Sequence, residues 1–206
     1  MVITWYGKNC FKLQSGDLVI VTDPFDKESG LTPFRGRTDI IIKTIAPLSI
    51  KRQASEEGFE IDYPGEYEVK GVGVEGWPIK SKKEDSKEKS EQIRTVYLIK
   101  IDDLKIVLLG HLTDEDEIKD VLEYLEDADI VFAPVGGKPL IETAAIAKLI
   151  RQLKPSLVVP ALIDGPKDLK PFLKELGQTE TQPQEKITIG KKDLSKEKLT
   201  IGCLKI

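Results

Sequence analysis

The stretch "ITWYGKNCFKLQSGDLVIVTDPF", residues 3–25, decides how the chain is expected to fold. It contains three short runs that are apolar or alternate between apolar and polar residues: 2–6, 10–14 and 18–22. Gly7 and the Ser-Gly-Asp sequence at 15–17 separate these runs, and such residues are typical of turns between strands. The sequence therefore predicts three short strands, the last of which ends at Asp23-Pro24.

Patterns of strands and helices continue along the chain. Further strand-like runs lie at 39–43, 59–63, 66–76, 95–101, 104–109, 129–135, 156–160, 186–189 and 198–205. Helical patterns lie at 48–56, 114–126, 141–153 and 167–176. Asp102-Asp103 predicts a hairpin turn, Thr113 can cap the second helix, and Gly177 ends the last one. Early strands followed by alternating helices and strands favour an α/β sandwich.

Two segments within this pattern have similar sequences. "TDIIIKT" at 38–44 and "ADIVFAP" at 128–134 are both apolar strands that open with an aspartate. This similarity indicates two related halves. Residues 80–94 carry no large apolar side chain except Ile93, and their mixed charges predict a solvated, flexible loop.

Composition narrows the class of protein. The 206 residues fit a single domain spanning 1–206, with 40% hydrophobic and 32% charged residues. The net charge of −4 lacks the basic balance of a nucleic-acid-binding protein. There is neither a membrane-length apolar run nor a signal-peptide layout at the N-terminus, so we expect a cytoplasmic protein. Its two cysteines, Cys10 and Cys203, are then expected to be free thiols.

Three motifs in this order resemble the metallo-β-lactamase superfamily. They are the stretch at 3–25, "YPGEYEVKGVGVEG" at 63–76, and "DADIVFAPVGGKPLIETAAIAKLIRQLKPSLVVPAL" at 127–162. They are most similar to the small bacterial branch that includes ascorbate-6-phosphate lactonase-like proteins. The resemblance covers nearly the whole chain. It implies a four-layer αββα sandwich and, for an intact family member, a zinc-dependent hydrolase.

The zinc ligands that the resemblance implies are not present. Matched by position, the family's ligands and the histidine near its N-terminus fall on Lys8, Ile45, Pro47, Ser49, Ile50, Ser81 and the pair Ala161-Leu162. The bridging aspartate is replaced by Gly110-His111. His111 is also the single histidine, whereas a catalytic zinc site usually takes about three protein ligands, mostly histidine. The sequence therefore predicts no bound metal and no cofactor. Apolar replacements avoid the cost of burying unpaired polar groups.

His111 is the one candidate for catalysis. It follows a strand and precedes a helix, where the resembling family keeps its active site. It could act as a general base or a lone ligand, or it could simply hydrogen-bond the turn at Thr113. The pattern favours the turn.

Other residues could contribute to a pocket. Asp23 could accept hydrogen bonds from loop amides, and Gly136 could approach a phosphate or form a tight turn. Asp23, Glu66, Glu68 and Glu142 could form an all-oxygen magnesium or calcium site, although no spacing requires it. Cys10 is expected in the core rather than in catalysis.

These observations leave one leading hypothesis and two alternatives. The leading hypothesis is a metal-free, non-catalytic protein that acts as a binding or scaffolding subunit, as a homo-oligomer or beside an active paralogue. The first alternative is a metal-dependent hydrolase of a small phosphorylated or lactone-like substrate, with a rebuilt site near His111. The second is a nucleic-acid-binding module, which the acidic pI of about 5.3 argues against.

Overall fold

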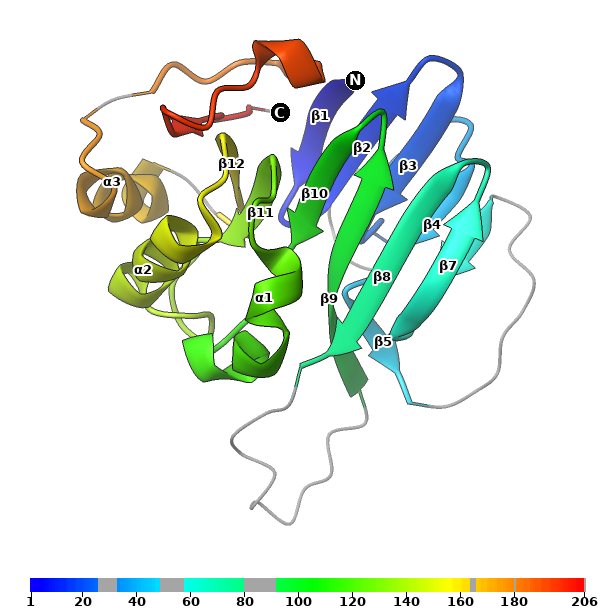
Figure 1. Cartoon of the computed structure of the whole chain (residues 1–206), viewed down its shortest axis with the longest axis horizontal. Coiled ribbons are helices and arrows are strands. Elements are labelled where there is room, and N and C mark those ends of the chain that lie inside the picture. The colour runs from blue at the N-terminus through cyan, green and yellow to red at the C-terminus, as the bar shows by residue number, and fades with distance from the viewer. Residues whose placement is uncertain (26–32, 49–57, 80–91, 164–165, 180, 206) are drawn as a thin grey trace.

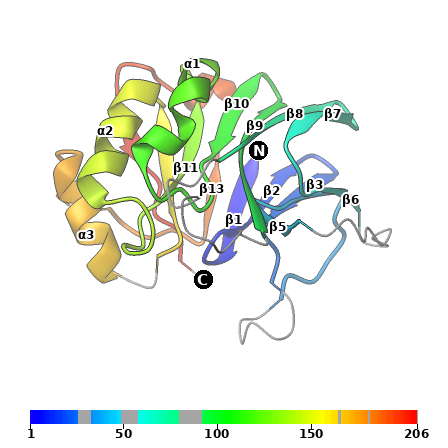
Figure 2. The same ribbon diagram turned by 90° about the horizontal axis from the view of Figure 1, so that it is seen from below.

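The computed structural model describes most of the chain (Figure 1). The described ranges are 1–25, 33–48, 58–79, 92–163, 166–179 and 181–205. They form two mixed sheets that pack face to face, with helices on one outer side (Figure 2). This is the α/β architecture that the sequence predicts.

The first sheet has six strands in the order β13-β1-β2-β3-β4-β6. Their bounds are β1 Val2–Gly7, β2 Cys10–Ser15, β3 Leu18–Thr22, β4 Ile40–Ile42, β6 Phe59–Ile61 and β13 Lys186–Thr188. The pairs β1-β2 and β2-β3 are antiparallel, as the turns at Gly7 and 15–17 require, whereas β3, β4 and β6 run parallel. The carboxyl ends of β3 and β4 therefore lie at one edge of this sheet.

The second sheet has eight strands, in the order β14-β12-β11-β10-β9-β8-β7 with β5 paired to β9. Their bounds are β5 Ile45–Pro47, β7 Gly65–Val69, β8 Val72–Pro78, β9 Gln92–Ile101, β10 Leu104–Leu108, β11 Ile130–Pro134, β12 Leu157–Ala161 and β14 Thr200–Ile201. The predicted hairpin turn at Asp102-Asp103 is confirmed, since both residues have positive φ, 52° and 60°. Only two residues of the predicted strand 198–205 form a strand. Beyond it, Leu204 makes an isolated bridge to Gln184.

The helices lie over the β10–β12 part of the outer face of the eight-stranded sheet, and β7 and β8 extend beyond them (Figure 2). They are η2 Glu115–Val121, α1 Leu122–Leu125, α2 Thr143–Leu153 and α3 Pro166–Glu175, with a short turn η3 at Lys191–Asp193. The predicted helix 114–126 is confirmed as η2 followed by α1, most of it in 3₁₀ form, but its N-cap is Asp114 rather than Thr113. The Thr113 hydroxyl instead donates to Glu117. The predicted helix 48–56 lies outside the described residues except for Leu48.

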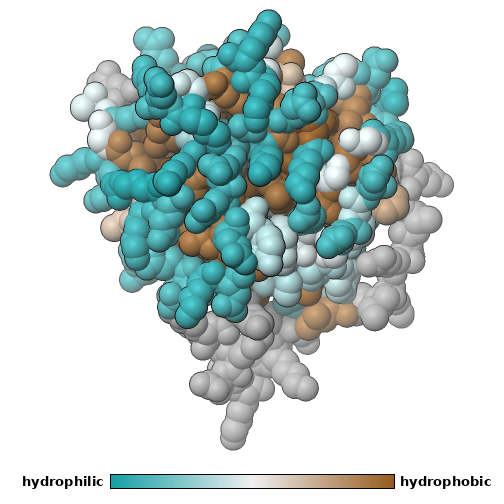
Figure 3. Space-filling view, in the orientation of Figure 1, coloured by the Kyte–Doolittle hydropathy of each residue, from teal (hydrophilic) through white to brown (hydrophobic). Residues whose placement is uncertain are grey.

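Two apolar cores follow from the alternation of side chains along the strands. On β9, Tyr97, Ile99 and Ile101 enter the core between the sheets. Val96 and Leu98, which point the other way, enter the core beneath the helices. The surface over the helices and the second sheet is largely hydrophilic, with apolar side chains in between (Figure 3). This distribution agrees with the high content of charged residues.

The sequence similarity between the two segments corresponds to a repeated arrangement of strands and hydrogen bonds. Asp39 and Asp129 each precede the middle one of three parallel strands, in β3-β4-β6 and β10-β11-β12. The carboxylate of Asp39 accepts from the Val19 amide at 3.0 Å, and that of Asp129 accepts from the Lys105 amide at 2.9 Å. The carbonyl oxygens of Val19 and Lys105 accept in return, at 2.8 Å each. This repetition supports the prediction of two related halves.

The predicted loop 80–94 is wrong at its end. Residues 80–91 lie outside the described residues, but Gln92, Ile93 and Arg94 belong to β9 and pair with β5. Charge patterning suggested a solvated segment, whereas the Arg94 guanidinium is only 17% exposed and binds Glu117. Among the described residues, no helix is long and apolar enough to cross a membrane.

Candidate functional site

Four polar side chains meet at the edge where the parallel strands end. Asn9 lies in the turn between β1 and β2, Asp23 follows β3, Thr44 separates β4 from β5, and His111 follows β10. Ligand sites in sheets with parallel strands form at such carboxyl ends. Asn9 and Thr44 are buried, at 5% and 0% exposure, and the other two side chains are partly buried.

Thr44 is the centre of this network. Its amide donates to Asp23 Oδ1 at 2.6 Å, and its hydroxyl donates to Asp23 Oδ2 at 2.6 Å. The same hydroxyl oxygen lies 3.3 Å from Asn9 Nδ2 and 3.1 Å from His111 Nδ1. Asn9 Nδ2 also donates to Asp23 Oδ2. The network therefore links Asn9, Asp23 and Thr44 of the first sheet to His111 of the second.

When Asp23 is in its carboxylate form, the hydrogen-bond roles assign one tautomer to His111. Thr44 has one hydroxyl proton, and it is donated to the Asp23 carboxylate. The oxygen of Thr44 can then only accept, so Nδ1 of His111 carries the proton that joins them. Nε2, the other ring nitrogen, has no hydrogen-bond partner among the described residues. An ionised Asp23 thus favours a neutral imidazole whose free lone pair is on Nε2.

Burial controls the protonation of both titratable groups. It raises the pKa of Asp23, although hydrogen bonds from Thr44 and Asn9 and the neighbouring His111 act in the opposite direction. Burial also lowers the pKa of His111. The Asp23 charge opposes that shift and the Arg94 charge adds to it. Both groups are therefore shifted toward their neutral forms.

An ion pair fixes the segment that carries His111. Arg94 makes two contacts to the Glu117 carboxylate, at 2.6 and 3.3 Å, and donates to the His111 carbonyl oxygen at 2.8 Å. The Glu117 carboxylate is 1% exposed and also accepts from the Thr113 amide at 2.8 Å. The backbone of His111 is thus held to β9 by a bidentate, charge-assisted pair.

A glycine allows the two sheets to approach each other here. Gly110 has φ +57°, and a Cβ atom at this position would lie 2.7 Å from Cβ of Thr44. No side chain could be accommodated without movement of the backbone or of Thr44. Gly110 therefore sets the distance at which His111 meets Thr44.

The positions matched to family ligands have mostly structural contacts. The carbonyl oxygen of Lys8 accepts from Trp5 Nε1 at 3.1 Å and from the Leu162 amide at 2.9 Å, which ties the β1-β2 turn to the end of β12. Ala161 is buried at the end of β12. Ile45 pairs with Arg94.

Pro47, a further matched position, makes a contact outside the network. The carbonyl oxygen of Pro47, which is exposed, accepts from the Tyr63 hydroxyl at 2.6 Å. Ser49, Ile50 and Ser81 lie outside the described residues.

The other predicted pocket residues do not join Asp23. Glu66 is exposed on β7, and Glu142 is 73% exposed with its carboxylate 3.6 Å from the Lys138 ammonium. A Cβ atom on Gly136 would meet the Leu162 carbonyl oxygen at 1.8 Å, so this glycine serves the close packing of two strand ends. Nothing in these contacts points to a phosphate.

The structure shows the contacts of Asp23, Cys10 and His111, for which the sequence predicted a role. Asp23 accepts a loop amide, that of Thr44, as expected. Cys10 is fully buried, and burial raises the pKa of its thiol to about 12, which agrees with a core role. His111 bonds Thr44 rather than the turn at Thr113, since Gly110 brings the two side chains together.

The donor set does not fit a zinc or dinuclear metal centre. Across the part of the chain that the structure describes, no group of three or more His, Cys, Asp and Glu side chains could hold an ion. Asp23 and His111 are the two candidate ligands at this edge, and both already bind Thr44. A catalytic zinc normally takes about three protein ligands, so the described residues do not supply them.

Sequence reasoning missed four members of the site: Asn9, Thr44, Arg94 and Glu117. Their contacts join residues that are 14 to 67 positions apart, and no local spacing signals such pairs. The position of Thr44 directly after a predicted strand was the one available clue.

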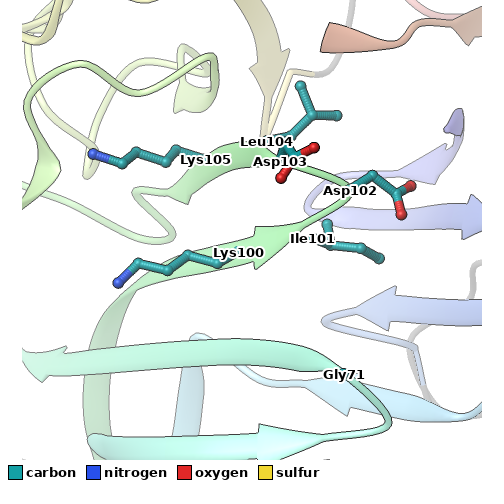
Figure 4. A pocket seen from close by; sticks show the side chains of 7 residues that line it. All are labelled: Gly71, Lys100, Ile101, Asp102, Asp103, Leu104 and Lys105. Carbon is teal, nitrogen blue, oxygen red and sulfur yellow. The ribbon is translucent and has the colours of Figure 1, made fainter.

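Two surface hollows lie away from this network. One, of about 460 Å³, surrounds the β9-β10 turn and is lined by Lys100, Asp102, Asp103 and Lys105 among others (Figure 4). That turn precedes β10, whereas His111 follows it, so the hollow lies at the opposite end of the strand. The other, of about 240 Å³, lies beside Ser156 and Thr200.

Comparison with known proteins adds a family. A family model described as "Beta-lactamase superfamily domain" matches residues 2–161. A Thermotoga maritima structure, described as a candidate zinc-dependent hydrolase of the metallo-β-lactamase superfamily, is 21% identical. It has a TM-score of 0.74 and covers 99% of both chains. A search of curated proteins finds no match.

Two further structures share the fold. The metallo-β-lactamase fold protein YhfI from Bacillus subtilis is 9% identical, with a TM-score of 0.63 over 86% of this chain and 93% of that one. An isothiocyanate hydrolase from Delia radicum gut bacteria is 12% identical, with a TM-score of 0.62 over 92% and 100%. Identities this low establish a common fold and not a common activity.

Proposed function

The chain belongs to the β-lactamase superfamily, and we propose that within it this protein binds no catalytic metal and acts as a binding or scaffolding subunit. It would have retained the scaffold of the ascorbate-6-phosphate lactonase-like branch and lost the zinc motifs. The partner would be a second copy of the chain or an active paralogue.

The observation that carries this proposal is the saturation of the network by Thr44. Oδ1 of Asp23 is taken by the Thr44 amide, and Oδ2 by the Thr44 hydroxyl and Asn9. Nδ1 of His111 is taken by the same hydroxyl. A metal would have to compete with these hydrogen bonds for Asp23, and with Nε2 of His111 it would still find too few ligands.

The position of Arg94 is a second argument against a cation. It lies directly across from Ile45 in the β5-β9 pair, so the two side chains share a face of the sheet. Ile45 occupies the position that the family resemblance gives to a zinc ligand. The charge of Arg94 is held near His111 by the bond to its carbonyl oxygen. The guanidinium opposes a divalent ion there, although the Glu117 carboxylate that it binds offsets part of its charge.

The relatives described as hydrolases do not oppose this proposal. The Thermotoga maritima protein is described as a candidate zinc-dependent hydrolase, and another relative as an isothiocyanate hydrolase. Both share the fold at low identity, and fold alone does not transfer chemistry. The ligand set of this chain is what decides its chemistry.

Calorimetric titration of the purified protein with zinc and with manganese tests the proposal. We expect no saturable heat from the wild type, and none from His111→Gln or Asp23→Asn. Stoichiometric binding to the wild type that is lost in both variants would overturn the proposal and favour a rebuilt metal site. Lys105→Ala, at the far end of β10, is the matched control and should behave as the wild type does.

A further inference from the structure

We infer that Nε2 of His111 is the proton acceptor of a metal-independent site for small weak acids, molecules that present an acidic O–H or N–H group. This inference rests on the proposed function, because a bound metal would compete for the same nitrogen. Beyond the proposed function, it names the class of ligand and the protein group that accepts the ligand's proton.

The first step is the orientation of the ring. Asp23 receives the hydroxyl proton of Thr44 at 2.6 Å, and Thr44 receives the Nδ1 proton of His111 at 3.1 Å. A histidine whose Nδ1 proton is committed in this way presents a basic lone pair at Nε2. The backbone bond from Arg94 to the His111 carbonyl oxygen, at 2.8 Å, holds the residue in place.

The second step is the balance of the proton transfer. The O–H or N–H bond of the ligand breaks, its electron pair stays on the ligand, and the proton forms a new bond to Nε2. The Nδ1 proton can then pass to the Thr44 oxygen while the Thr44 proton passes to Asp23. The ligand becomes an anion, His111 returns to a neutral form, and Asp23 becomes a carboxylic acid. No oxidant, reductant or metal is needed.

The third step is the charge that surrounds the bound anion. Asp23 and Arg94 are the charged groups that act on His111, and Glu117 compensates Arg94. Once Asp23 has taken up a proton, it no longer repels an anion. The partly buried Arg94 remains beside the site as the cationic partner of the Glu117 carboxylate. The network is therefore suited to the anionic product of the transfer rather than to a cation.

A buried hydroxyl beside the network is a further, independent observation. Thr95 belongs to the buried residues, at 1% exposure, and its Oγ1 makes no hydrogen bond of regular geometry to the described residues, although the Tyr97 hydroxyl lies near enough for Thr95 to act on the Tyr97 pKa. The Tyr97 hydroxyl on the same strand face donates instead to the Tyr63 carbonyl oxygen, at 3.2 Å. The Thr95 amide donates to the Thr44 carbonyl oxygen at 2.9 Å, which places the residue next to Thr44. Buried hydroxyls are normally satisfied, so a bound polar molecule is expected here.

The tautomer is tested by nitrogen NMR of the single histidine, which gives one pair of ring signals. For the neutral ring we expect the Nδ1–H form in the wild type. In Asp23→Asn the new amide can donate to Thr44, which then donates to Nδ1, so the proton should move to Nε2. Thr44→Val, which only removes the acceptor, should give a mixture. A wild-type ring protonated at Nε2 would overturn the inference, even if the variants do not fold.

Ligand binding is tested with 4-nitrophenol, whose phenolate absorbs where the phenol does not. At a pH below the phenol's own pKa, we expect added wild-type protein to produce a saturable phenolate band that a chelator does not remove. His111→Gln should lose the band, and Lys105→Ala should keep it. No band with the wild type, or an equal band with His111→Gln, would overturn the inference. Loss of the band with the chelator would instead overturn the proposed absence of metal.

Discussion

Replacement of Thr44 by valine removes the centre of the network and leaves the shape of the side chain almost unchanged. Three interactions of the hydroxyl are lost: 2.6 Å to Asp23, 3.1 Å to His111 and 3.3 Å to Asn9. The bond to a carboxylate contributes about 1.5–3 kcal/mol and each neutral bond about 0.5–1.5 kcal/mol. Because the amide bond from residue 44 to Asp23 remains, we expect a loss of about 2–4 kcal/mol.

This loss is measured by urea denaturation and by calorimetry. For a chain of this size, about 2–4 °C of Tm are lost per kcal/mol, so Thr44→Val should lower Tm by about 4–16 °C. Thr188→Val is the matched control, since Thr188 is an exposed threonine in a strand, and it should change stability by no more than about 0.5 kcal/mol. Equal effects of the two substitutions would refute the view that the Thr44 hydroxyl joins the sheets.

Three further predictions concern other contacts of the fold. A hydrogen bond from a lysine is the main reason why the pKa of Asp39 is lowered to about 2. The contribution of Asp39 to stability should therefore be complete above its unfolded pKa of about 3.9 and be lost as the pH falls toward 2. Asp39→Asn should flatten the pH dependence of urea unfolding in this window. Gly110→Ala should destabilise the protein by about 1–3 kcal/mol in thermal unfolding, because the new Cβ meets Thr44 at 2.7 Å and φ is positive. Arg94→Ala should lower the free energy of unfolding by about 3–5 kcal/mol, because it leaves the buried Glu117 carboxylate unpaired. Arg94→Met combined with Glu117→Leu should lower it much less. Equal losses for the two variants in chemical denaturation would contradict this explanation.

Much of the fold could be predicted because its signals are local. Alternation of apolar and polar residues predicted the strands at the N-terminus, and Asp102-Asp103 predicted a hairpin turn. The aspartates that open two similar segments, Asp39 and Asp129, indicated the repeated halves. Each of these signals spans fewer than ten residues.

The candidate site was harder to predict because it depends on pairs that are distant in sequence. Thr44 and His111 are 67 residues apart and meet only when the two sheets pack. Arg94 stood at the end of a charged segment and was assigned to a solvated loop, although it pairs with Ile45 as part of β9 and its guanidinium binds Glu117. The family resemblance could predict that the zinc ligands are replaced in this chain. It could not predict which side chains meet at this edge of the sheets.

Metal content tests the central claim most directly. Untagged protein, produced in medium supplemented with zinc and manganese, would be analysed by elemental mass spectrometry beside an active family member treated in the same way. The account predicts far less than one metal ion per chain, while the family member retains its own. One or two tightly bound ions per chain would contradict it and would mean that this edge of the fold still holds a metal centre.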